Sequence, residues 1–69
     1  MEDAIAEFHT AIRLDPDNAL PHLSLGIVLE RKGDRFAALE EIEKARELDP
    51  NDTSIAKAYE RMRRKAGNG

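Results

Sequence analysis

Residues 4–16 read AIAEFHTAIRLDP, and residues 38–50 repeat the same pattern 34 positions later as ALEEIEKARELDP. Over the whole chain this offset gives seven identities in 35 aligned pairs, whereas roughly two are expected from average residue usage. The identities fall on two alanines, on one glutamate, on the Leu-Asp-Pro turn and on Gly33 with Gly67. We therefore interpret the chain as a repeat with a period of 34 residues.

Proline, glycine and capping residues divide the chain into four predicted helices. The apolar spacing and the turn residues place them at about 2–14, 19–32, 35–48 and 53–66. Pro16 and Pro50 cannot continue a helix, because proline lacks the backbone N–H and disfavours helical geometry in the residue before it. The connections are short, so successive helices are expected to be antiparallel neighbours.

Each boundary has its own capping signal. Four polar residues are candidate N-caps of the last three helices: Asn18, Asp34 and either Asp52 or Thr53. Gly33 and Gly67 are expected to end the second and fourth helices. In the predicted third helix the apolar positions are Phe36, Leu39, Ile42, Ala45 and Leu48. Leu14 and Leu48 are expected to close the first and third helices, just before an Asp-Pro pair breaks each of them.

The composition bounds the class of protein. The chain has 69 residues, which make one small domain over residues 1–69, and it has no cysteine for disulfides or thiolate metal sites. The formal charge of −3 argues against general nucleic-acid binding. The chain has no stretch that could insert in a membrane and no signal sequence, so we expect a soluble protein of the cytoplasm.

No pattern in the sequence predicts catalysis. The two histidines, His9 and His22, are 13 positions apart on different predicted helices, whereas metal binding needs three or four converging ligands. The isolated glycines do not form a phosphate-binding loop. We therefore predict no catalytic, cofactor or metal site, and a protein that is not an enzyme.

The repeat resembles the tetratricopeptide repeat (TPR), whose signature is W-x2-L-G-x2-Y, then A-x3-F, A and P over 34 residues. The first element is matched by His22, Leu25, Gly26 and Leu29, and the second by Ala38, Ile42, Ala45 and Pro50. Ala4, Phe8, Ala11 and Pro16 match the second element again. The resemblance implies an all-α, antiparallel helix–turn–helix solenoid of about four helices.

This resemblance also implies a domain layout. Residues 1–16 would be the second helix of an incomplete repeat, residues 17–50 a complete repeat and residues 51–69 a polar capping helix. The apolar stripe of Ala4, Ile5 and Phe8 then lacks its usual partner helix. Either the chain is a piece of a longer solenoid or another chain covers that face.

In TPR proteins an apolar stripe on the first helix of each repeat lines a concave groove that binds partner peptides. By that register the groove floor consists of Leu20, Leu23 and Ile27. Its rim consists of Glu30, Arg31, Lys57, Arg61 and Arg64. The other interpretation is that the floor residues only pack against the first and fourth helices. The basic residues near the end of the chain also suit the dipole of a last helical turn.

The predicted function is therefore an adaptor or scaffold module that binds another protein through an apolar and acidic peptide segment. The alternative is a structural segment that forms homo-oligomers through the exposed face of its first helix. The glutamates of the third helix, at positions 40, 41, 43 and 47, are interpreted as a solvated outer face.

Overall fold

The computed structural model describes residues 2–68, and the side chains of residues 4–64. Four α-helices account for this part of the chain: α1 (Glu2–Leu14), α2 (Ala19–Lys32), α3 (Arg35–Leu48) and α4 (Thr53–Asn68). The first three have the predicted bounds. The fourth runs past Gly67 to Asn68, so the prediction that Gly67 ends it is wrong. An all-α repeat fold is confirmed for the described residues.

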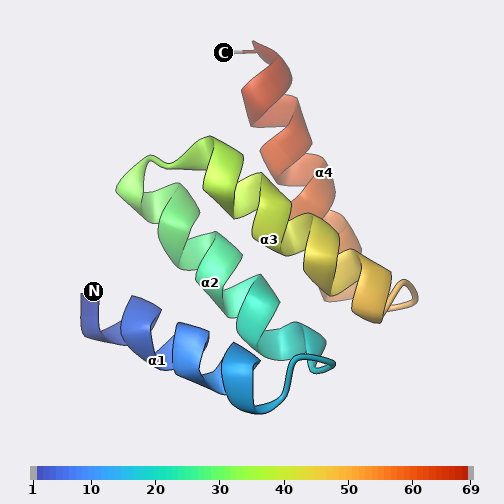
Figure 1. Cartoon of the computed structure of the whole chain (residues 1–69). Coiled ribbons are helices and arrows are strands. Elements are labelled where there is room, and N and C mark those ends of the chain that lie inside the picture. Colours follow the sequence, from blue (N-terminus) through green and yellow to red (C-terminus); the bar gives the residue numbers. More distant parts are fainter. Residues whose placement is uncertain (1, 69) are drawn as a thin grey trace.

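The helices stack in chain order, and each runs antiparallel to the one before it (Figure 1). Helices α2 and α3 form the centre of the stack, with α1 beside α2 and α4 beside α3. Helix α4 also reaches α2. In the described part of the chain α1 packs on α2 alone.

Two equivalent turns join α1 to α2 and α3 to α4. In the first turn the Asn18 N–H donates to the Asp15 carbonyl over 3.2 Å, and in the second the Asp52 N–H donates to the Asp49 carbonyl over 3.2 Å. The two turns are 34 residues apart and share this hydrogen bond, so the repeat in the sequence is also a repeat of backbone structure.

The predicted N-caps are confirmed. Asn18 Oδ1 accepts a hydrogen bond from the Leu20 N–H at 3.1 Å, and Asp34 Oδ1 accepts one from the Ala37 N–H at 3.2 Å. Of the two candidates for α4, the cap is Asp52, because Thr53 is already the first helical residue. Gly33 ends α2 at a φ of 95°, where glycine has no side-chain penalty.

Asp52→Ala is expected to destabilise the chain by about 1 kcal/mol, the usual cost of losing an N-cap. Asp52 Oδ1 accepts hydrogen bonds from two N–H groups of the first turn of α4, at 2.8 Å from Ser54 and 3.2 Å from Ile55. Urea unfolding followed by circular dichroism measures the effect. Asp52→Asn is the matched control, because the amide oxygen can still cap and most of the stability should remain.

The core lies between α2, α3 and α4. Its fully buried larger side chains are Leu25, Ile42 and Ile55, one from each of the three helices. The other buried apolar residues are smaller or less enclosed: Ala19, Ala38, Ala45, Ala58 and Met62. Small residues on α3 therefore alternate with the branched side chain of Ile42, and this lets the neighbouring helices approach closely.

Gly26 lies at a close contact between α2 and α3. A Cβ atom at this position would lie 2.7 Å from Ile42 Cδ1 and 3.1 Å from the Ala38 carbonyl oxygen. The Ile42 side chain and the Ala38 backbone therefore leave little room for a larger residue at this position.

Three large apolar side chains lie outside the core. Leu14 is 79% exposed, Phe36 is 88% exposed and Leu48 is 38% exposed. The sequence pattern groups Phe36 with the apolar positions of its helix, but it precedes the buried Ala45 by about two and a half turns and therefore lies on the opposite side of α3. Leu14 and Leu48 are the last residues of α1 and α3, as predicted, and lie beside the turns that follow.

Candidate interaction site

Four of the predicted groove residues surround one hollow on the face formed by α2 and α4. Ile27, Glu30 and Arg31 come from the second half of α2, and Arg61 comes from α4. The hollow has a volume of about 440 Å³. It therefore combines one aliphatic side chain with two cations and one carboxylate.

An ion pair connects the two helices across this hollow. Arg61 Nη2 lies 3.4 Å from Glu30 Oε1. The Glu30 side chain is largely buried, whereas that of Arg61 is about half exposed. A pair of this kind adds little to stability. Its consequence is electrostatic, because Glu30 partly neutralises the cation that an incoming acidic group would meet.

The other predicted groove residues are distributed around this hollow. Leu23 and Ile27 are half-buried and pack against the core cluster, so part of the predicted floor also serves as core. Lys57 and Arg64 are exposed on α4 but do not line the hollow. Leu20 lies at the start of α2 and lines a different hollow, beside the two Asp-Pro turns.

A family model described as "TPR repeat" matches residues 1–33, from the start of α1 to the glycine that ends α2. This match supports assigning the chain to the tetratricopeptide-repeat family. No curated protein matches the chain significantly. TPR units generally mediate protein–protein interactions and are typically non-catalytic.

His22 stands at the TPR signature position that a bulky aromatic residue usually occupies. It is buried, and its Nδ1 lies 2.8 Å from Glu41 Oε1 on α3. Lys44 Nζ lies 3.8 Å from the second oxygen of Glu41. The histidine therefore replaces an apolar anchor by a polar contact between α2 and α3. Glu41 is half-buried, so the interpretation of all four α3 glutamates as a solvated face is wrong for this residue.

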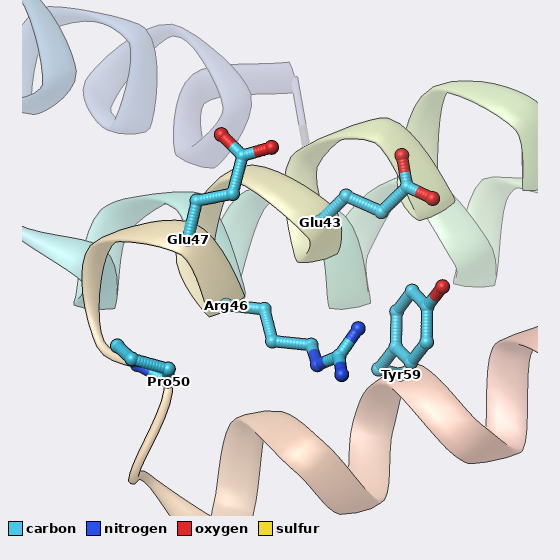
Figure 2. A pocket seen from close by; sticks show the side chains of 5 residues that line it. All are labelled: Glu43, Arg46, Glu47, Pro50 and Tyr59. Carbon is cyan, nitrogen blue, oxygen red and sulfur yellow. The ribbon is translucent and has the colours of Figure 1, made fainter.

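A second polar hollow lies between α3 and α4 (Figure 2). Glu43, Arg46, Glu47, Pro50 and Tyr59 surround a volume of about 340 Å³. Arg46 points toward Tyr59, with its Cζ 4.4 Å from the ring centroid, and Arg63 Cζ lies 5.8 Å from the same centroid. Such contacts contribute about 0.5–1 kcal/mol at exposed sites. Sequence reasoning missed this cluster.

Two further findings concern metal sites and membrane-spanning helices. Among the described residues, no three histidine, aspartate or glutamate side chains are grouped to hold a metal ion. None of the helices in the described residues is long and apolar enough to cross a membrane.

Proposed function

We propose that this TPR chain is a protein-interaction module that binds an apolar and acidic peptide segment on the α2–α4 face. The observation that carries the proposal is the hollow in which Ile27 lies beside Arg31 and Arg61. An aliphatic side chain of the ligand would contact Ile27, and its carboxylates would face the two guanidinium groups. We further propose that residues 17–50 are the complete repeat and residues 51–69 the capping helix.

The charges around the hollow favour an acidic ligand. Lys57, Arg61 and Arg64 lie on the same helix at spacings of four and three residues, and all are exposed. Residues at these spacings lie on one side of a helix. Cations arranged in this way attract an anionic segment from a distance, so they raise the association rate more than the affinity.

A second function is a structural one, in which copies of the chain associate through α1. It is supported by the packing of α1, because Ile5 and Phe8 are only half-buried and α2 is the one described helix that covers them. Sedimentation of Phe8→Ser against the unmodified chain tests it: self-association through α1 must weaken, and unchanged association would contradict the proposal.

Arg61→Glu is expected to weaken peptide binding about tenfold at low salt, mainly through slower association. The variant removes one attractive charge and adds a repulsive one beside Glu30. The probe is a fluorescent synthetic peptide of two leucines flanked by glutamates. Stopped-flow anisotropy gives its association and dissociation rate constants. The effect should shrink as salt rises, because exposed charges are screened beyond about 8 Å at physiological ionic strength.

Two variants are the controls. Arg13→Glu makes the same change in net charge on α1, the first helix of the chain, and should leave peptide binding nearly unchanged. Glu30→Gln removes the carboxylate that faces Arg61 and should strengthen binding of the acidic peptide. If Arg13→Glu weakens binding as much as Arg61→Glu, the effect is one of net charge and the site lies elsewhere.

A further inference from the structure

The two ends of the helical stack carry opposite charge. At one end lie the α1–α2 and α3–α4 turns, with the carboxylates of Asp15, Asp17, Asp49 and Asp52. At the opposite end lies the α2–α3 turn, flanked by three cations and one carboxylate: Arg31, Lys32, Arg35 and Asp34. Figure 1 shows this single turn at one end and the pair of turns at the other.

Each end also exposes apolar side chains. Between the paired turns is a hollow of about 330 Å³, which Leu20 and Leu48 line together with Asp17, Asp49 and Asp52. Leu20 is 59% exposed. At the opposite end Phe36 projects from the first turn of α3 with 88% of its surface exposed. A large exposed apolar side chain is thus at one end, and a hollow that combines two leucines with three aspartates is at the other.

We propose that these two ends bind each other between copies of the chain. The α2–α3 turn of one copy enters the notch between the paired turns of the next. The ring of Phe36 contacts Leu20 and Leu48, while Lys32 and Arg35 face Asp17 and Asp49. The hollow is large enough for an aromatic ring, since its volume of about 330 Å³ exceeds the roughly 150 Å³ of a closed cavity that holds benzene.

The two copies contribute different surfaces to the contact, so the association is head-to-tail and does not form a two-fold dimer. Head-to-tail contacts generate rings or open chains. The molecule measures only 14 Å between Cα atoms along its shortest axis. The contact area is therefore small, and the interface belongs to the weak class below about 1,200 Å². The expected products are short chains that form at high protein concentration.

This association does not depend on the peptide-binding proposal. Ile27 and Arg61 take no part in it, and Phe36, Leu20 and Leu48 do not line the α2–α4 hollow. The side chains of Asp34 and Asp52 cap helices, so the docking charges are those of the other residues in the turns.

The first test is sedimentation equilibrium of the whole chain from micromolar to millimolar concentration, at low and high salt. We expect the average mass to rise with concentration and the rise to diminish with salt. Phe36→Ser should raise the dissociation constant about tenfold or more, the effect of losing a buried aromatic contact. Tyr59→Ser removes an aromatic ring from the middle of α4, away from both ends, so it is the matched control and should not change the dissociation constant.

The second test exchanges the charges. Asp17→Lys/Asp49→Lys reverses the acidic end, and Lys32→Glu/Arg35→Glu reverses the basic end. Neither variant should associate alone, and an equal mixture should, because each reversed end then meets an end of opposite charge. Circular dichroism verifies folding; none of the four residues is a side-chain cap.

Three outcomes would overturn the proposal. The first is sedimentation of the unmodified chain as a monomer at every concentration. The second is association that persists in Phe36→Ser and vanishes in Phe8→Ser, which would place the contact on α1. The third is a mixture of the folded charge-reversed variants that does not associate.

Discussion

Gly26→Leu is expected to destabilise the chain by about 1–3 kcal/mol, the usual cost of overpacking a core. At this position the first added carbon already lies 2.7 Å from Ile42 Cδ1 and 3.1 Å from the backbone oxygen of Ala38. The isoleucine side chain can rotate, but the carbonyl cannot move without displacing α3. Since 1 kcal/mol corresponds to about 4–8 °C for a domain of this size, thermal melting by circular dichroism detects the effect.

A double-mutant cycle separates crowding from other effects of the substitution. Gly26→Ala adds one methyl group, which favours the helix by about 1 kcal/mol and opposes the crowding. Ile42→Val removes the Cδ1 atom but keeps Cγ1, which lies 2.8 Å from the added carbon, so it should relieve the crowding by the methyl group in part. If Gly26→Leu melts at the temperature of the unmodified chain, α2 and α3 do not meet at Gly26 and the assigned repeat register is wrong.

The helix bounds could be predicted because their causes are local. Pro16 and Pro50 stop helices wherever they stand, and Asn18 and Asp34 cap helices through N–H groups two and three residues away. Gly33 needs only its own φ of 95°. Gly67 shows the limit of this reasoning. A glycine ends a helix only if the chain leaves the helical conformation there, and α4 continues to Asn68.

The burial of individual side chains could not be predicted in the same way. Phe36 lies on the opposite side of α3 from the buried Ala45, and Leu14 ends its helix beside a turn, so their apolar character alone did not place either of them in the core. The contact of His22 with Glu41 joins residues 19 positions apart. It depends on the relative position of α2 and α3, which the periodicity of either helix does not contain.

Part of the candidate site could be predicted from the sequence and part of it could not. The α2 register correctly grouped Ile27, Glu30 and Arg31, because residues three and four positions apart share a helix face. The same register placed Leu20 with them, although it lies about two turns earlier and lines the hollow between the Asp-Pro turns. Which of the α4 cations meets α2 depends on the crossing of the two helices, and the structure places Arg61 within 3.4 Å of Glu30.

Ile27→Glu is expected to reduce binding of the leucine–glutamate peptide by about a hundredfold or more, since it removes the apolar contact and repels the ligand's carboxylates. Ile27 is half-buried beside the solvent-filled hollow, so the glutamate can extend toward water and the helix content should change little. Anisotropy titration gives the affinity and circular dichroism gives the helix content.

Two comparisons decide what a loss of binding means. Ile27→Leu keeps the apolar surface and should bind within a few-fold of the unmodified chain. Leu20→Glu adds the same charge to α2 at the other hollow and should leave binding nearly unchanged, because Leu20 and Ile27 line different sites. If Ile27→Glu unfolds the chain, its contact with the core cluster is the dominant one and the residue is core. If Ile27→Glu stays folded and still binds, the peptide does not use the α2–α4 face.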